Sequence, residues 1–168
     1  MYRHMPRIYI AGPLFSDAEI RYNECLDEFL VEKGFKTFLP QRDGYKLSDL
    51  LANGYSISVA MRQIFDRDLD EIRNSDILVL ILDGRVPDEG ACIEVGYAYG
   101  IGKECIGLKT DSRSLMFDLD NPLIVGALKN KIARSFDELD HLLSKIKIKN
   151  MGSSPRREIN TVECSLTE

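Results

Sequence analysis

The chain has 168 residues, the usual length of a single domain built around one hydrophobic core. Hydrophobic residues make up 44% of it and charged residues 29%, which excludes a fibrous or largely disordered protein. The net charge of −5 argues against a nucleic-acid polymer as the main ligand, because phosphate backbones are held chiefly by Lys and Arg. We therefore expect a globular domain that binds a small, uncharged or cationic molecule.

The cysteines and the N-terminus bear on the compartment. None of the four cysteines belongs to a C-x-x-C pair, so neither a zinc knuckle nor a thioredoxin-type redox centre is indicated, and we expect reduced thiols. The N-terminal residues contain no apolar stretch long enough for a signal peptide or a membrane span. We therefore expect a cytoplasmic protein that makes no membrane contact.

The N-terminal segment predicts a strand followed by a helix. Residues 7–11 are β-branched and aromatic and end at a Gly-Pro pair, which is typical of a buried strand that closes on a turn. Ser16 and Glu19 then fit a capping box, and apolar residues at helical spacing continue until Gly34 ends the helix.

The middle of the chain continues this alternation. Residues 35–39 predict a short strand that Pro40 stops, and the polar stretch 41–55 predicts a loop with at most a turn of helix. Residues 59–74 carry apolar side chains at roughly helical spacing. Residues 77–82 are all aliphatic, which is typical of a central strand of a parallel sheet that is covered on both faces.

Two further strand and helix signals complete the series. Residues 89–101 are rich in Gly and Ala and predict a helix, and residues 105–109 predict a strand. Residues 132–133 predict a weak last strand before an amphipathic helix over residues 136–146. Strands and helices therefore alternate along the whole chain.

This alternation predicts an α/β fold with a doubly wound, flavodoxin-like, mostly parallel five-stranded sheet that has helices on both faces. We expect residues 1–149 to form this domain and the polar residues 150–168 to form a flexible C-terminal tail. In such sheets ligands bind outside the carboxyl ends of the strands. The loops 12–15, 83–90 and 110–122 are therefore expected to converge on a site.

The helix predicted over residues 89–101 carries the main candidate for chemistry. Gly90 and Ala91 leave its start uncrowded, so a ligand can approach the backbone there. Glu94 lies about one turn further on, among apolar neighbours and near the positive end of the helix dipole. Such a carboxylate is held ionised and partly desolvated, which suits a nucleophile. The same spacing equally fits a glutamate that complements the dipole on a solvated face.

Asp66, Asp68 and Asp70 lie late in the helix predicted before the central strand. The pattern favours an exposed acidic face that is paired with Arg67 and Arg73. We expect no metal here, because an EF-hand loop needs glycine and glutamate at fixed positions and a catalytic metal site normally recruits histidine.

Two turns bear on cofactor and ligand contacts. The turn at Gly12-Pro13 lacks both the phosphate-loop pattern and the three glycines of a dinucleotide fingerprint, so we expect no cofactor. The turn from Asp111 to Arg113 fits either a capped turn or a ligand contact, and the pattern alone does not decide.

Four short segments, taken in order, carry a family resemblance. They are residues 8–15 (IYIAGPLF), 68–76, 87–98 (PDEG-x-x-x-E-x-GYA) and 110–113 (TD-x-R). Together they resemble the nucleoside 2-deoxyribosyltransferase family, with matching order and spacing over roughly residues 7–145.

The resemblance implies a retaining glycosyl transfer. Glu94 attacks C1′ of a 2-deoxyribose, the nucleobase leaves, and a second nucleobase takes the sugar. The resemblance further implies that Asp68 and Asp88 lie near the base and the sugar, where they help to protonate the leaving base and to orient the substrate, and that Tyr9 positions the nucleophile. An asparagine that reaches in from the neighbouring subunit contacts the sugar, and Asn121 matches it. The candidate substrate-binding residues are Gly12, Pro13, Phe15, Gly90, Arg113 and Asn121.

The loop before Glu94 bears on the choice between nucleosides and nucleotides. In the related nucleotide hydrolases small hydroxyl residues hold the phosphate there, whereas this chain has Asp88 and Glu89. Two carboxylates repel a dianionic phosphate. We therefore expect a substrate with a free 5′-hydroxyl, unless Arg85 or Arg113 turns inward.

Two alternatives stay open. A hydrolase of nucleosides or of nucleoside 5′-monophosphates would pass the sugar to water instead of a base. A non-catalytic nucleotide-binding module is the alternative from another class, since a fold does not guarantee an activity. The expected partners are a small-molecule nucleoside and a nucleobase. We expect a homodimer or larger homo-oligomer, because the family completes each site across a subunit contact.

Overall fold

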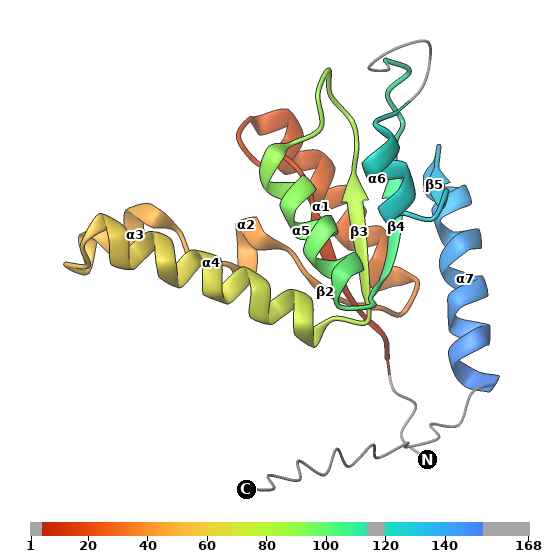
Figure 1. Cartoon of the computed structure of the whole chain (residues 1–168), viewed down its shortest axis with the longest axis horizontal. Coiled ribbons are helices and arrows are strands. Elements are labelled where there is room, and N and C mark those ends of the chain that lie inside the picture. The colour runs from red at the N-terminus through yellow and green to blue at the C-terminus, as the bar shows by residue number, and fades with distance from the viewer. Residues whose placement is uncertain (1–4, 114–119, 153–168) are drawn as a thin grey trace, which may run out of the picture.

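The computed structural model describes residues 5–113 and 120–152 (Figure 1). These residues form a parallel sheet with the strand order β2-β1-β3-β4-β5. The strands are β1 (Arg7–Ala11), β2 (Lys36–Phe38), β3 (Ile77–Ile81), β4 (Glu104–Leu108) and β5 (Ile132–Ala133). The predicted doubly wound, flavodoxin-like α/β fold with five strands is confirmed.

Helices cover both faces of the sheet (Figure 1). They are α1 (Asp17–Glu32), α2 (Pro40–Asp43), α3 (Leu47–Ala52), α4 (Ile57–Asn74), α5 (Glu89–Gly100), α6 (Pro122–Ala127) and α7 (Phe136–Gly152). Helices α1 and α7 pack against Ile10 and Val79, whereas α4, α5 and α6 pack against Tyr9 and Leu80. Successive strand residues point to opposite faces, which places Tyr9 under α4 and α5. None of the helices in the described ranges has both the length and the apolar character needed to cross a membrane.

The topology places a crevice at the carboxyl ends of β1 and β3. These two strands pair directly, with Ala11 opposite Leu80 at their ends. The chain leaves β1 toward α1 on one face and leaves β3 toward α5 on the other. This reversal is the switch point at which doubly wound sheets bind ligands.

The start of α1 forms as its sequence predicts. Ser16 Oγ accepts a hydrogen bond from the backbone N–H of Glu19, and the Glu19 carboxylate accepts one from the backbone N–H of Ser16. Gly34 follows the helix with φ of +79°, a conformation that only glycine adopts without strain.

The stretch 41–55, predicted as a loop with at most one helical turn, is mostly helical. Pro40 occupies the first turn of α2, where its missing N–H costs nothing. Leu50 of α3 is buried, and α3 packs on α4. The second short helix therefore depends on a tertiary contact that a local pattern does not reveal.

Other boundaries differ from the prediction as well. Helix α6 was not predicted, although Asn121 caps it and Pro122 starts it. Helix α7 continues to Gly152, beyond the predicted end at residue 146. Most of the predicted tail, residues 153–168, lies outside the described residues.

Candidate active site

Tyr9 on β1 and Glu94 on α5 are joined by a hydrogen bond. The Tyr9 hydroxyl donates to Glu94 Oε1 at 2.6 Å. The Tyr9 ring is fully buried and stacks on Phe38, with the ring centroids 5.3 Å apart. Burial, and then the charges of Glu94 and Asp68, raise the pKa of Tyr9 far above its ordinary value. The phenol therefore keeps its proton and is a fixed donor to Glu94.

Glu94 lies in the second turn of α5 and is only partly exposed. Burial raises the pKa of its carboxyl from 4.5 to about 8. The hydrogen bond from Tyr9 lowers this pKa, whereas the negative charges of Asp68 and Asp88 raise it further. Burial therefore favours the protonated form of Glu94, in the direction opposite to that expected from the helix dipole.

Asp68 on α4 is the third member of this group, which we call the Tyr9–Asp68–Glu94 cluster. Its charge acts on both Tyr9 and Glu94. Burial raises the pKa of Asp68 to about 6, with Arg67 lowering it and Glu71 raising it. The two carboxyls therefore titrate between about pH 6 and pH 8, and near neutrality they hold about one proton between them.

The acidic neighbours of Asp68 have a different environment. Arg67 forms an ion pair at 2.9 Å with the buried Glu71, so the predicted pairing of Arg67 with an aspartate is wrong. The pairing predicted for Arg73 is correct. The surface pairs are Arg62–Asp66 and Arg73–Asp70. Asp68 is thus distinguished from Asp66 and Asp70 by its partial burial beside the cluster.

Asp88 caps the N-terminus of α5. Its Oδ2 accepts a hydrogen bond from the backbone N–H of Ala91 at 2.8 Å. The same carboxylate raises the pKa of Glu94. Gly90 is exposed beside it, and a Cβ there would lie 3.1 Å from Asp88 Oδ2. Glycine therefore keeps the start of the helix uncrowded, as its type predicts.

The loop between β1 and α1, which we call the β1 loop, carries three candidate substrate-binding residues. A Cβ on Gly12 would lie 2.9 Å from Ile81 Cβ, so glycine permits close packing on β3. The Pro13 carbonyl accepts a hydrogen bond from Asn23 Nδ2 at 2.8 Å. Phe15 has 80% of its surface exposed, so its ring is available for contacts outside the chain.

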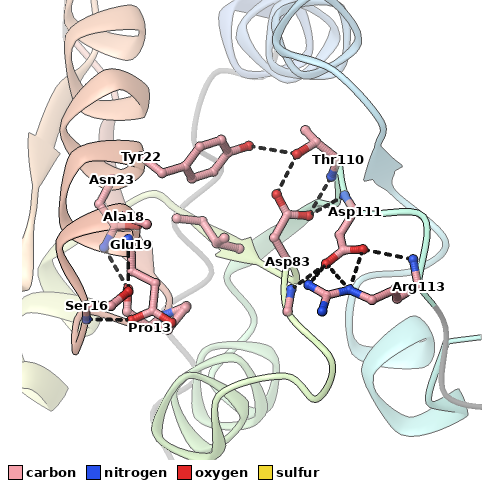
Figure 2. Close-up of a pocket in the computed structure, with 12 residues that line it drawn as sticks. Pro13, Ser16, Ala18, Glu19, Tyr22, Asn23, Asp83, Thr110, Asp111 and Arg113 are labelled. Atoms are coloured by element: carbon pink, nitrogen blue, oxygen red, sulfur yellow. Dashed lines mark hydrogen bonds and ion pairs between the residues drawn. The ribbon is translucent and has the colours of Figure 1, made fainter.

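The three loops predicted to converge line one pocket of about 420 Å³ (Figure 2). Asp83 Oδ1, at the end of β3, accepts hydrogen bonds from the backbone N–H groups of Thr110 at 2.6 Å and Asp111 at 2.8 Å. Asp111 in turn accepts one from Gly84. Pro13 supplies the β1 loop side of the lining. The predicted convergence is confirmed, although the Tyr9–Asp68–Glu94 cluster does not belong to this lining.

Arg113 lines the same pocket and turns back onto Asp111 (Figure 2). Its Nε donates to Asp111 Oδ2 at 2.8 Å, and its backbone N–H donates to Oδ1 at 2.9 Å. The guanidinium holds the pKa of Asp111 well below its usual range. The turn is therefore capped by Asp111, and a contact between Arg113 and a ligand stays a prediction.

Asn121 caps α6 through its side chain. Its Oδ1 accepts a hydrogen bond from the backbone N–H of Leu123 at 2.9 Å. Its contact with the sugar in a neighbouring subunit stays a prediction.

Two residues near the site were not predicted, and both had a signal. Asp83 directly follows the all-aliphatic strand, at the sheet edge where ligands bind. Asn23 falls on the apolar stripe of α1 between Ile20 and Leu26, where a polar side chain is expected to be buried.

A doubly wound sheet with carboxylates gathered beside its switch point defines the class of α/β enzymes that act on a small molecule at the edge of a parallel sheet. The chain belongs to the nucleoside 2-deoxyribosyltransferase family, whose sequence model matches residues 8–153. The predicted family and the predicted enzyme are thereby confirmed, and the chain acts on N-glycosidic bonds. The non-catalytic alternative is set aside.

Solved structures share the fold. A conserved protein from Enterococcus faecalis V583 is 29% identical, with a TM-score of 0.71 over 85% of this chain and 99% of that one. A 2-deoxyribosyltransferase from Bacillus psychrosaccharolyticus is 20% identical, with a TM-score of 0.65 over 80% of this chain and 90% of that one. A 2-deoxyribosyltransferase from Leishmania mexicana is 21% identical, with a TM-score of 0.59 over 83% and 97%. No curated protein sequence matches the chain significantly.

Proposed function

We propose that the chain transfers a 2-deoxyribosyl group from one nucleobase to another, with Glu94 as the nucleophile. The hydrogen bond of 2.6 Å from Tyr9 to Glu94, with Asp68 close by, is the observation that supports this role. A carboxylate held by a fixed donor beside a second carboxyl is the arrangement that a covalent glycosyl transfer requires.

The proposed reaction has two steps. In the first, a Glu94 oxygen forms a bond to C1′ while the bond from C1′ to the base nitrogen breaks, and Asp68 gives its proton to the departing base. In the second, a nitrogen of another base attacks C1′, its proton passes to Asp68, and Glu94 leaves as a carboxylate. Tyr9 donates to the same carboxylate throughout.

This reaction requires Glu94 ionised and Asp68 protonated. The pKa values of about 8 for Glu94 and about 6 for Asp68 favour the opposite placement of the shared proton. Because the two pKa values differ by two units, about one in 100 of the sites that hold a single proton carries it on Asp68. Only this form can react. The pH profile of activity should therefore be bell-shaped, with limbs near pH 6 and pH 8. Its maximum should depend on the hydrogen bond from Tyr9, which favours the ionised form of Glu94.

The direct test is base exchange. The chain is incubated with a 2′-deoxynucleoside and a different free base, and the exchanged nucleoside is the expected product. Glu94→Ala should abolish exchange, and a slow 2-fluorinated nucleoside should add its sugar mass to Glu94. Release of free sugar and base alone would replace transfer by hydrolysis, and a label on another residue would refute Glu94 as the nucleophile.

We further propose a nucleoside rather than a nucleotide as substrate. Asp88 adds negative charge beside Glu94, and Glu89 is exposed in the next position. Arg113 is engaged by Asp111, and Arg85 is exposed. A dianionic phosphate near Asp88 would meet repulsion that grows as water is excluded. Thymidine should therefore react with a higher kcat/KM than its 5′-monophosphate, and the reverse order would overturn this preference.

We also propose that a second copy of the chain completes the site. Helix α3 and the first part of α4 extend away from the sheet (Figure 1). Eight apolar side chains on this arm, residues 45–65, have between 39% and 63% of their surface exposed. They are Tyr45, Leu47, Leu51, Tyr55, Ile57, Val59, Met61 and Phe65. Exposed apolar surface of this extent is typical of a protein contact.

Mixing two inactive variants tests the shared site. Glu94→Ala and Asn121→Ala should each be inactive alone if Asn121 serves the neighbouring subunit. Random mixed dimers should regain about a quarter of the wild-type activity, because half of them carry one intact site out of two. No recovery after subunit exchange, with both variants folded, would place every essential residue in one chain.

A further inference from the structure

Asn23 is a buried amide on α1 whose hydrogen bonds all leave its own helix. It is 3% exposed, and its Nδ2 donates to the Pro13 carbonyl at 2.8 Å and to Gln41 Oε1 at 2.9 Å. Its Oδ1 has no partner within the part of the chain that the structure describes. A buried oxygen left unpaired costs free energy, so an apolar side chain would fit this place on α1 more favourably. The two donated bonds therefore point to a role other than core packing.

The first of these bonds holds the β1 loop. Asn23 Nδ2 donates a hydrogen bond to the carbonyl of Pro13. The Glu19 carboxylate accepts hydrogen bonds from the backbone N–H of Phe15 at 3.0 Å and of Ser16 at 2.8 Å. The backbone is thus held on both sides of Phe15. Because Pro13 faces the open pocket of Figure 2, these polar contacts replace the packing that a buried loop would have.

The second bond connects the loop to the neighbouring strand. Gln41 lies on α2, directly after β2, and its Nε2 donates to the Ile20 carbonyl of α1 at 3.0 Å. Phe38 at the end of β2 stacks on Tyr9. Asn23 therefore joins the segment after β1 to the segment after β2, the two strands that carry Tyr9 and its stacking partner.

We propose that Asn23 is a positioning residue for the reaction. Asn23 fixes the position of the β1 loop, and with it the exposed ring of Phe15. The loop is therefore already ordered when the substrate of the Tyr9–Asp68–Glu94 cluster binds. A loop ordered before binding lowers the cost of association, which lowers KM. This inference rests on the proposed function for its kinetic consequence, but its structural consequence stands without it.

The chain supplies a matched control one helical turn away. Asp27 lies on the same buried side of α1, is 6% exposed and pairs with Arg42 of α2. It links α1 to the same short helix as Asn23 does, but its ion pair does not involve the β1 loop. Asp27→Asn therefore weakens the link between α1 and α2, whereas Asn23→Ala also releases Pro13.

The experiment measures kinetics and hydrogen exchange on the full chain. For Asn23→Ala we expect KM for the deoxynucleoside to rise about 10-fold or more, with kcat per folded enzyme changed by less than about threefold, because binding and not chemistry loses its support. Asp27→Asn should leave KM unchanged. The amides of Phe15 and Ser16 should exchange faster in Asn23→Ala than in the wild type, and at the wild-type rate in Asp27→Asn.

Three outcomes would overturn the proposal. They are an unchanged KM in Asn23→Ala, an equal rise in both variants, and unchanged exchange at Phe15 and Ser16. A merely structural role would lower the folded fraction, and so the apparent kcat, at constant KM. If Asn23→Ala is too unstable to assay, Asn23→Ser, which also lacks Nδ2, carries the same expectation. A wild type without exchange or hydrolysis would refute the proposed function, while the hydrogen-exchange result would still decide the role of Asn23.

Discussion

Replacing Tyr9 by Phe removes one oxygen atom and the 2.6 Å hydrogen bond to Glu94 Oε1. The buried ring and its stacking on Phe38 should remain, because Phe has the same shape. The hydroxyl stabilises the ionised form of Glu94 and so lowers its pKa. The substitution therefore acts on the proton shared by Glu94 and Asp68 more than on the core.

The size of the effect follows from the hydrogen bond. A hydrogen bond to a charged group contributes about 1.5–3 kcal/mol, and one pKa unit corresponds to about 1.36 kcal/mol. Loss of the bond should raise the pKa of Glu94 by about 1–2 units above its value of about 8. The fraction of sites with the proton on Asp68 and Glu94 ionised should fall by about 10–100-fold.

The assay is the pH dependence of kcat/KM for base exchange in the wild type and in Tyr9→Phe. We expect the maximum to fall by about 10–100-fold and the basic limb to move from near pH 8 to about pH 9–10, while the acidic limb near pH 6 stays in place. If the acidic limb moves instead, Glu94 and not Asp68 governs it, and the proton placement argued from the burial of Glu94 is wrong. An unchanged profile would remove Tyr9 from the mechanism.

Four further substitutions test the site and the fold. Asp68→Asn should lower kcat by about 10²–10⁴-fold and turn the bell into a single rise with pH, because no proton donor remains; a retained basic limb in the kcat profile would contradict this. Glu94→Gln should stabilise the chain increasingly as the pH rises from 5 to 8. The raised pKa means that the folded state keeps a proton that the unfolded state loses above about pH 4.5, so wild-type stability falls as the pH rises toward 8. The melting temperature of Glu94→Gln should therefore exceed that of the wild type by a margin that grows from pH 5 to pH 8, and a constant margin would count against a buried, protonated Glu94. Gly12→Ala should lower the free energy of unfolding by about 1–3 kcal/mol in urea titrations, since its Cβ would press on Ile81. Gly96→Ala, with no atom within 4 Å of the added Cβ, should be neutral or raise it by up to about 1 kcal/mol.

The strands were predictable because their signals are local and strong. The all-aliphatic β3 and the β-branched β1 are each buried over most of their length. Nearly every residue in them is therefore apolar, and the sequence alone indicates a buried strand. The short helix α3 has one buried side chain, Leu50, and its stability comes from packing on α4. Six residues with one buried side chain show no apolar periodicity, which explains why the sequence predicts a loop over residues 41–55.

The cluster was less predictable, because its chemistry is set by solvation. Asp66, Asp68 and Asp70 are alike in sequence, and only the fold buries Asp68 beside Tyr9 and Glu94. Tyr9 and Glu94 are 85 positions apart, so no spacing rule connects them. The resemblance to a family identified Asp68, Tyr9 and Glu94 as a group, but the raised pKa of Glu94 required its burial to be known.

The parallel sheet separates two clusters of buried apolar side chains. Tyr9 lies on the face under α4 and α5, the helices that carry Asp68 and Glu94, whereas α7 covers the opposite face with Leu139 and Leu143. Substitutions under α7 can therefore change the packing and stability of the fold without altering the charges around Glu94. Of the two faces, the α7 side is therefore the one on which substitutions can raise heat resistance at least risk to catalysis, provided that Asn23 on α1 is kept.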